Sequence, residues 1–533
     1  VFTGIPQIYH IVRKKQWKLF AKSFALSLAA LLIAILVVAQ NLFSIREYTP
    51  YSTRGGYAIS IQEGDETQQD QKGVGFDYAT NWSYSISEWW NLIIPKFHGG
   101  TSNELYSGDA VPAWKNRVLP TYWGTMPFTQ SYEYMGILIV FFALIGVIFL
   151  WEKWEVKSLT FLTIFALLLS LGKNFDILYK PFFYYMPYFD KFRAPVMILT
   201  LVMFTLSLLA AFGLSFLVKG NLGQKEVLKR LYFVMGLFAI LLAIPLALGS
   251  TFSLTHSGEA QRYSQEVINL LKKVRLEMLI NSTLLSLVFL LTAIISIWAI
   301  MKNWFRREYV LLILFGVIII DFMILNVPYL KGKFVEPARI HQQYTANSID
   351  QEIKKDNSLY RVYPFGPLFS DVRWLYHHQS IGGYSPAKLQ LIQEIVDNCL
   401  YQKIEESYPI NWNVINMLNV KYMVLNQQIN SPRLKLVAEL PDQKLFAYLN
   451  KSHLPRAFFV GNYQLIPDGV ERLKQLNNPD FQPDKTAILE EQPDGEILKP
   501  DSSYIEISTF APEEINLNVY TDKPTLLVLS EIH

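Results

Sequence analysis

Long apolar runs separated by short polar segments dominate the first 330 residues of the chain. A bilayer core about 30 Å thick needs roughly 20 apolar residues in a helix, and about 17 to 25 are tolerated. On this criterion we predict about seven membrane-spanning helices, of which the second and third are short. The predicted spans are 19–43, 136–151, 158–172, 195–218, 231–249, 278–301 and 308–327.

The pattern changes after residue 328, where short alternating segments and turn residues replace the long apolar runs. These segments predict strands at 360–365, 421–426, 434–440, 444–450 and 456–466. The run SPAKLQLIQEIVDNCL (385–400) predicts a helix with Ser385 as its N-cap and Pro386 in its first turn. Asn347 and Asp468 are expected to begin two further short helices.

The predicted fold is therefore a multi-spanning α-helical membrane protein with a C-terminal α+β domain that leads into a β-sandwich. Its expected parts are a basic segment and first span (1–43), an aromatic-rich loop (44–135), six further transmembrane helices (136–327), an α+β domain (328–500) and the start of the sandwich (501–533). We interpret the sequence as a fragment, because it starts at Val1 without a signal-peptide pattern and stops within what resembles a buried strand.

Lysine and arginine residues in the short loops predict the orientation in the membrane. Basic residues gather before the first span, between the fourth and fifth spans and between the sixth and seventh spans, so this side should be cytoplasmic. The loop 44–135 and the residues after 328 are then expected outside the cytoplasm. Two groups of cations on the outer side do not fit the rule and need another explanation: Lys173, Lys180, Lys191 and Arg193, and Arg262, Lys272, Lys273 and Arg275.

Composition agrees with a membrane protein and excludes some functions. Only 17% of the residues are charged and 51% are hydrophobic, whereas a soluble chain carries about 25% charged residues. A net charge of +3 gives no basic footprint for nucleic acid. The single cysteine, Cys399, rules out an internal disulfide and is expected to be a small buried residue. The adjacent His377 and His378 lack the spacing of metal-binding pairs, and no metal site is predicted.

The aromatic-rich loop contains candidate ligand-binding residues. Arg54 precedes a glycine pair, and the stretch 75–100 contains Asp77, Trp82, Glu88 and His98. Aromatic rings stack on sugar faces and carboxylates accept sugar hydroxyls, so this mixture suits a carbohydrate. It equally suits an interfacial belt, in which Trp and Tyr lie at the level of the lipid headgroups.

Several stretches resemble one family of membrane proteins. They are FDYATNWSYSISEWWNLIIPKFHGG (76–100), YWGTMPFTQSYEYMG (122–136), LGKNFDILYKPFFYYMPYFDKFRAPVMIL (171–199), SIGGYSPAKLQ (380–390) and INMLNVKYMVLN (415–426). Together they are similar to the YfhO-type bacterial membrane proteins, particularly the forms found in Bacteroidetes.

The resemblance implies a GT-C-like fold in the bacterial cytoplasmic membrane. It further implies a glycosyltransferase that takes a sugar from a polyprenyl-phosphate carrier and transfers it to a cell-envelope glycan or polymer on the extracytoplasmic side. GT-C enzymes usually carry an acidic residue in their first outer loop that acts as base or metal ligand. That loop is expected upstream of Val1, so the resemblance names no catalytic residue in this sequence and leaves a divalent metal open.

A lipid-linked sugar phosphate leaves as an anion, so its site needs fixed cations just outside the hydrocarbon. Arg193, Lys191 and Lys173 lie in the loop between the third and fourth predicted spans and are candidates, with Asp190 orienting Arg193 or Lys191. The alternative is snorkelling, in which long cationic side chains near helix ends reach the headgroups without contacting substrate.

Two other functions stay open at this point. One is a flippase or exporter for a lipid-linked glycan, which would favour internal repeats and polar groups near the middle of the membrane. Asp321 is the main charged residue inside a predicted span, and it either hydrogen-bonds within the bundle or serves function. The other is a non-catalytic envelope scaffold whose outer domain binds glycan or a partner.

Overall fold

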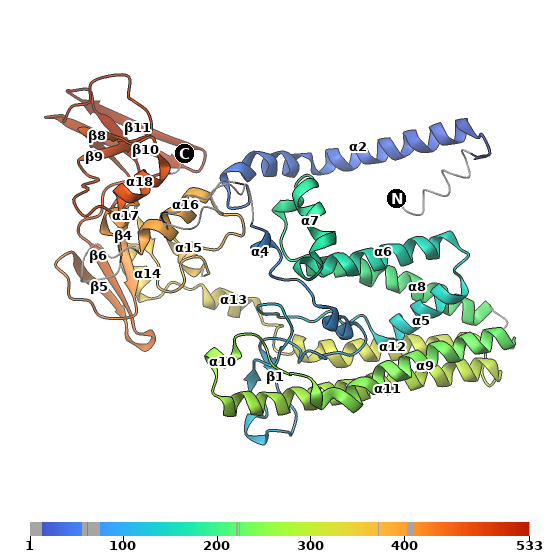
Figure 1. Cartoon of the computed structure of the whole chain (residues 1–533). Coiled ribbons are helices and arrows are strands. Elements are labelled where there is room, and N and C mark those ends of the chain that lie inside the picture. The colour runs from blue at the N-terminus through green and yellow to red at the C-terminus, as the bar shows by residue number, and fades with distance from the viewer. Residues whose placement is uncertain are drawn as a thin grey trace. The chain divides into compact units, whose positions relative to one another are not determined.

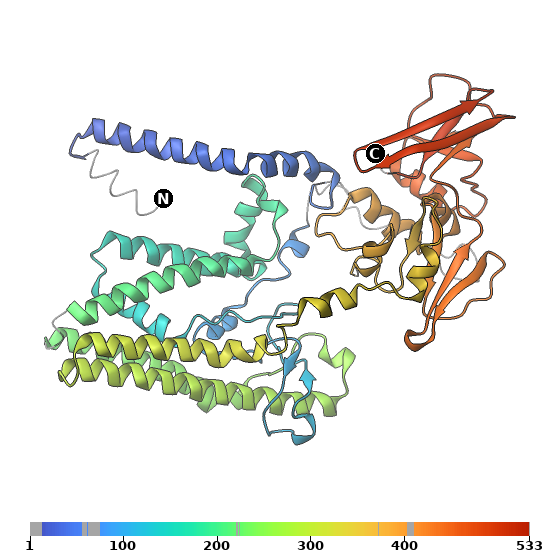
Figure 2. The ribbon, with the colours of Figure 1, turned by 180° about the vertical axis from the view of Figure 1, so that it is seen from behind.

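The computed structural model describes residues 13–55, 61, 75–219, 222, 224–370, 372–401 and 410–531. The chain forms two compact units, which Figures 1 and 2 show from opposite sides. The membrane unit comprises Val1–Gln40 and Val74–Phe334, and the C-terminal unit comprises Asn41–Gly73 and Val335–His533. The predicted loop 44–135 is therefore divided, with its first part in the C-terminal unit.

Apolar helices of different lengths make up the membrane unit. They are α2 (Trp17–Tyr48, which continues past the unit's boundary), α5 (Ile137–Phe149), α6 (Trp154–Ser170), α7 (Asp176–Tyr185), α8 (Leu199–Lys219, preceded by the 3-10 turn Pro195–Ile198), α9 (Lys225–Leu248), α11 (Gln265–Met301) and α12 (Arg307–Leu330). In the described part of the chain, five of them (α2, α8, α9, α11 and α12) are long and apolar enough to cross a membrane. The prediction of a multi-span membrane protein is confirmed.

The second and third predicted spans differ from this pattern. α5 has only 13 residues, or about 20 Å at 1.5 Å per residue. α6 is followed, after a 3-10 turn at Gly172–Phe175, by α7 at an angle of 113°, and the bent pair gives a sixth span only if it is counted as one. The structure thus contains helices at all seven predicted places, and within the described ranges five or six of these are long enough to span a membrane.

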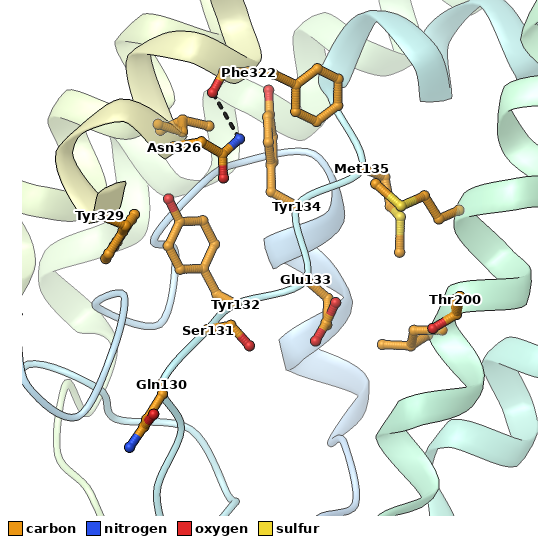
Figure 3. A pocket seen from close by; sticks show the side chains of 13 residues that line it. Gln130, Ser131, Tyr132, Glu133, Tyr134, Met135, Thr200, Phe322, Asn326 and Tyr329 are labelled. Atoms are coloured by element: carbon orange, nitrogen blue, oxygen red, sulfur yellow. Dashed lines mark hydrogen bonds between the residues drawn. The ribbon is translucent and has the colours of Figure 1, made fainter. Parts of the chain in front are cut away.

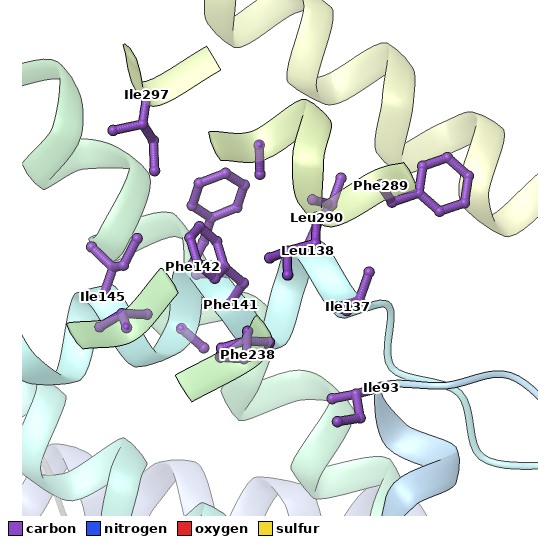
Figure 4. Close-up of a cluster of buried hydrophobic side chains, with 14 of the residues drawn as sticks. Ile93, Ile137, Leu138, Phe141, Phe142, Ile145, Phe238, Phe289, Leu290 and Ile297 are labelled. Atoms are coloured by element: carbon purple, nitrogen blue, oxygen red, sulfur yellow. The ribbon is translucent and has the colours of Figure 1, made fainter. Parts of the chain in front are cut away.

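Close backbone contact joins α5 to α8. Gly146 lies against the Leu209 carbonyl and Gly213 lies against the Phe142 carbonyl, so a Cβ atom at either glycine would clash with backbone. Small residues at such crossings let helices approach closely inside a membrane. Next to this contact, apolar side chains of α5, α9 and α11 form the core in Figure 4, including Phe141, Phe238 and Leu290.

α11 has 37 residues, or about 55 Å at 1.5 Å per residue, so it is longer than the hydrocarbon core. Its N-terminal part carries the loop structure of the unit. The short elements there are β1 (Glu104–Leu105), the turn Pro112–Trp114, β2 (Val118–Leu119) and α10 (Glu259–Arg262). The other short elements of the unit's loops are α4 (Phe76–Ala79), which packs against α7, and the 3-10 turn Ile86–Leu92. β1 and β2 pair in antiparallel fashion.

A four-stranded sheet in the order β3-β4-β6-β5 forms the centre of the C-terminal unit. Its strands are β3 (Arg361–Tyr363), β4 (Val420–Leu425), β5 (Leu434–Leu440) and β6 (Leu445–Asn450), which confirms four predicted strands. The predicted strand 456–466 is instead divided into β7 (Ala457–Val460) and β8 (Asn462–Leu465). β8 pairs with β9 (Thr486–Leu489), β7 pairs with β12 (Leu526–Leu529), and β10 (Ser503–Ala511) pairs with β11 (Glu514–Thr521).

The helices of this unit are mostly short. They are α13 (Pro337–Gln343), α14 (Ser348–Ile353), α15 (Arg373–His377), α16 (Gln390–Ile395), α17 (Trp412–Met417) and α18 (Gly469–Leu476). Asn347 caps α14 and Asp468 caps α18, as predicted. The helix predicted from Ser385 begins only at Gln390, because the preceding residues pair with another segment: Thr53 donates to the Lys388 carbonyl at 2.9 Å.

The α5–α8 contact predicts a specific effect of one methyl group. We expect Gly213→Ala to destabilise the membrane unit by about 1–3 kcal/mol, because the new Cβ overpacks against the Phe142 carbonyl. Gly236→Ala in α9 is the matched control, since nothing lies within 4 Å of its Cβ position. Denaturant unfolding in mixed micelles measures the free energy of unfolding of both variants. Equal values for the two variants would contradict the packing argument.

Candidate functional site

A cavity of about 340 Å³ lies at the end of the bundle where α5 and α8 begin and α12 ends. Figure 3 shows that its wall is the loop segment 130–135 together with side chains of α8 and α12. The lining residues are Gln130 to Met135, Leu199, Thr200, Met203, Phe322, Leu325, Asn326 and Tyr329. Tyrosine rings, amides, hydroxyls and one carboxylate therefore share one concave site.

The carboxylate belongs to Glu133, which is half-buried in this wall. Figure 3 shows its side chain in the space between the 130–135 segment and α8. Burial raises the pKa of Glu133 above its ordinary value of about 4.5. Among the described residues, no hydrogen bond or ion pair to this carboxylate is present, so its oxygens can accept from a ligand.

Two other carboxylates near the cavity are already occupied by tyrosine hydroxyls. Tyr134 donates to Asp321 at 2.9 Å. Tyr329, in the cavity wall, donates to Glu104 at 2.7 Å, and Lys96 forms an ion pair with the same carboxylate at 2.7 Å. Asp321 thus hydrogen-bonds within the unit, which is one of the two roles expected for it.

Arg193 lies beside two aromatic residues of the loop. Its guanidinium donates to the Tyr78 hydroxyl at 2.6 Å and lies 5.9 Å from the centre of the Trp82 ring. The Trp82 indole in turn donates to the Phe128 carbonyl at 3.2 Å, two residues before Gln130 of the cavity wall. Two of the candidate binding residues, Arg193 and Trp82, are thereby brought together, and Trp82 is connected to the chain just before the segment that lines the cavity.

Several of the outer cations have carboxylate partners. Lys191 pairs with Asp190 at 2.6 Å, so of the two roles expected for Asp190 the structure shows the contact with Lys191. Lys180 pairs with Asp176, and Arg275 pairs with Glu259. These pairs reduce the excess positive charge that the sequence places on the outer side. Of the remaining candidates, Lys173 and Asp77 are exposed.

Glu88 and His98 have internal contacts. Glu88 is fully buried and accepts from the Tyr122 hydroxyl at 2.5 Å and from the Thr125 hydroxyl at 2.7 Å, while it caps the turn Ile86–Leu92. His98 is buried against the Trp123 ring, and burial lowers its pKa to about 4. These contacts are those of residues that hold the loop together.

Arg54 lies in the C-terminal unit, where its Nε donates to the Pro386 carbonyl at 3.1 Å. In the same unit His378 contacts Asp350 at 3.1 Å. Burial opposes ionisation of Asp350, but hydrogen bonds from His378 and Arg373 outweigh it and lower its pKa. Among the described residues, no group of three or more His, Cys, Asp or Glu side chains could hold a metal ion.

Glu133 is the residue that sequence reasoning missed. It stands in QSYEYMG directly before an apolar run, and this motif contributes to the prediction only through the family resemblance. The available signal was a single carboxylate between two tyrosines at the mouth of a predicted span. Glu88 has a similar aromatic setting in SEWW, so the signal alone does not separate an available carboxylate from an occupied one.

Comparison of the chain with models of protein families, with curated proteins and with solved structures finds no match. The class of the protein is therefore defined by its own helices, which are those of a multi-pass membrane protein with a strand-rich C-terminal unit. The YfhO-type resemblance stays a prediction.

His98 provides a pH-dependent test of loop packing. The folded state favours the neutral form of His98. Its contribution to the free energy of unfolding is therefore fully present above pH 6.5 and is lost as the pH falls toward 4. A change in the pKa of His98 from 6.5 to about 4 corresponds to a change in the free energy of unfolding on the order of 3 kcal/mol. We expect His98→Gln to reduce the loss of unfolding free energy over this pH range, whereas the exposed His341→Gln should leave it unchanged. Identical pH profiles for wild type and His98→Gln would contradict the assignment.

Proposed function

We propose that this protein is a membrane glycosyltransferase that transfers a sugar from a polyprenyl-phosphate carrier to a cell-envelope glycan or polymer. The observation that carries the proposal is Glu133, an available carboxylate with a raised pKa in a polar and aromatic cavity at the end of the bundle. A pKa moved toward neutrality is typical of a general base or acid.

The composition of the cavity wall supports a sugar as ligand. Tyr132 and Tyr329 offer ring faces, while Gln130, Asn326 and Thr200 offer amide and hydroxyl groups. Ligand sites commonly have volumes of about 300–1,000 Å³ and a few placed polar groups in an otherwise apolar wall. The cavity, at about 340 Å³, falls at the lower end of this range.

The proposed chemistry divides between two residues. The acceptor hydroxyl attacks the anomeric carbon, its proton passes to the Glu133 carboxylate, and the bond from that carbon to the phosphate oxygen breaks. Polyprenyl phosphate then leaves with the bonding electrons. Arg193, which hydrogen-bonds to Tyr78 and lies over the ring of Trp82, would stabilise the charge on the phosphate.

The distribution of basic residues supports an extracytoplasmic site in the cytoplasmic membrane. At the opposite end of the bundle, where α8 and α11 end and α9 and α12 begin, the short loops and the adjoining helix ends carry many Lys and Arg residues, and the positive-inside rule assigns this end to the cytoplasm. These residues are Lys219, Lys225, Lys229, Arg230, Lys302, Arg306 and Arg307.

The role of Glu133 can be tested with the protein in lipid, supplied with radiolabelled polyprenyl-phosphate sugars and envelope acceptor. We expect Glu133→Gln to lower transfer by about 100-fold or more, because the amide cannot accept the proton. In the wild type, transfer should fall on acidification at a pH above 4.5, since the base must be ionised and its pKa is raised.

Glu226→Gln is the matched control, since Glu226 is an exposed carboxylate at the opposite end of the bundle. Unchanged transfer by Glu133→Gln would remove Glu133 from the mechanism. If the wild-type protein transfers sugar from no donor and instead moves the carrier across the membrane of proteoliposomes, this result would contradict the enzyme proposal and support a flippase.

Arg193 is tested by its shape as well as its charge. We expect Arg193→Ala and Arg193→Lys both to impair transfer, because only the planar guanidinium can donate two parallel hydrogen bonds to phosphate. KM for the lipid-linked donor and kcat should be measured separately in both variants. Full activity of Arg193→Lys would mean that only the positive charge or the anchoring of the side chain matters, and not the paired hydrogen bonds of the guanidinium. Full activity of Arg193→Ala would exclude Arg193 from the site.

A further inference from the structure

α7 and the residues after it carry an exposed apolar stripe. One face of α7 is buried, where Tyr179 and Phe183 pack against Ala79 and Leu169. The opposite face is open: Ile177 is 80% exposed and Tyr185 is 85% exposed. The stripe, called here the α7 face, consists of Ile177, Tyr184, Tyr185, Met186, Tyr188 and Phe192, all exposed.

The direction of α7 relates this face to the membrane surface. α6 packs along α8, which is one of the candidate spans. α7 turns from α6 by 113°, which differs from a right angle by 23°. A helix of ten residues is only about 15 Å long, so α7 cannot cross the hydrocarbon core by itself.

The chemistry of the segment suits the headgroup layer. Four of the six side chains of the α7 face are aromatic, and three of these are tyrosines, which are enriched where an apolar body meets water. From residue 173 to residue 193 the chain has four cationic and two acidic side chains, a net charge of +2. α7 itself is neutral, because Asp176 and Lys180 form an ion pair, and the positive charge lies in the residues that flank it. An amphipathic helix with aromatic residues and flanking cationic side chains is typical of a segment that lies in the membrane interface and attracts anionic headgroups.

We propose that α7 lies in the bilayer interface, with the α7 face inserted among the phospholipid headgroups and the first part of the acyl chains. The segment binds the lipid surface itself and prefers anionic phospholipid. This role does not depend on the proposed function, since it needs neither the cavity nor a sugar.

Depth-dependent fluorescence quenching tests the proposal on the full chain. Cys399, the single cysteine, is buried, and Cys399→Ser provides a background for Tyr185→Cys and Ile177→Cys, each labelled with an environment-sensitive dye. The protein is reconstituted in vesicles of phosphatidylcholine and phosphatidylglycerol, with nitroxide quenchers attached either near the headgroup or deep in the acyl chain. Because both sites are highly exposed, neither substitution removes a packed side chain.

Two labelled controls calibrate the depth. Gln265→Cys is exposed at the N-terminal end of α11, 13 residues before the apolar stretch that begins at 278, which is about 20 Å along the helix. It should be quenched by aqueous iodide. Val288→Cys is exposed on the middle of the apolar part of α11 and should be quenched most by the deep nitroxide.

We expect residues 177 and 185 to be quenched several-fold more by the shallow nitroxide than by the deep one or by iodide. Raising the phosphatidylglycerol fraction should increase this quenching. If the labels at residues 177 and 185 are quenched mainly by iodide, as at residue 265, then α7 lies in water. If they are quenched most by the deep nitroxide, as at residue 288, then α7 is part of a broken span. Protection from all three quenchers would mean that protein covers the α7 face. Each of these three results overturns the proposal.

Discussion

The buried guanidinium of Arg275 holds the loop end of the membrane unit together. It lies on the part of α11 that precedes the apolar stretch, with a fully buried side chain. It donates to the carbonyls of Pro120, Thr121, Tyr122 and Leu254 and to the carboxylate of Glu259. An unpaired buried charge would be strongly destabilising. Here the carboxylate and the carbonyls satisfy all of its donors, so two separate loop segments are fixed on one helix.

A series of contacts continues from this point toward the cavity. Tyr122, held through its carbonyl, places its hydroxyl against Glu88 and accepts from the Met126 amide at 3.0 Å. Two residues later the Phe128 carbonyl holds the Trp82 indole, and the cavity-lining segment follows at 130. Buried polar groups that are hydrogen-bonded to one another restrict the positions of the loop residues that carry them. A catalytic carboxylate benefits from such a support, because its position must be kept within a fraction of an ångström.

Local sequence patterns predicted most helices and strands. Contacts between residues that are distant in sequence determine which polar side chains are available at the candidate site. Apolar length and alternation reveal most spans and strands because both are properties of consecutive residues. The third predicted span ends at residue 172, near the end of α6, but the short helix α7 and its direction were not predicted, since α7 packs against Ala79, which is distant in sequence. Glu88 and Glu133 look alike in sequence, and hydrogen bonds from Tyr122 and Thr125, which are 34 and 37 residues after Glu88, help to make Glu88 a structural carboxylate. The pairing of Tyr134 with Asp321 spans 187 residues and was equally hidden.

The same distinction bears on how charge is counted across a membrane. Counting by sequence treats every outer Lys and Arg as free, so eight of them seemed to conflict with the predicted orientation. Lys180, Lys191 and Arg275 have carboxylate partners in the structure and contribute little net charge. Arg193 differs, because its hydrogen-bond acceptor is the neutral Tyr78 hydroxyl, beside an aromatic face. In an ion pair, the carboxylate neutralises the charge of the cation, so the pair attracts a further anion only weakly. A guanidinium that is hydrogen-bonded to a phenol hydroxyl has no such counter-charge and can attract a phosphate. Within the proposed function, this difference favours Arg193 over Lys191, which is paired with Asp190, as the cation that meets the phosphate.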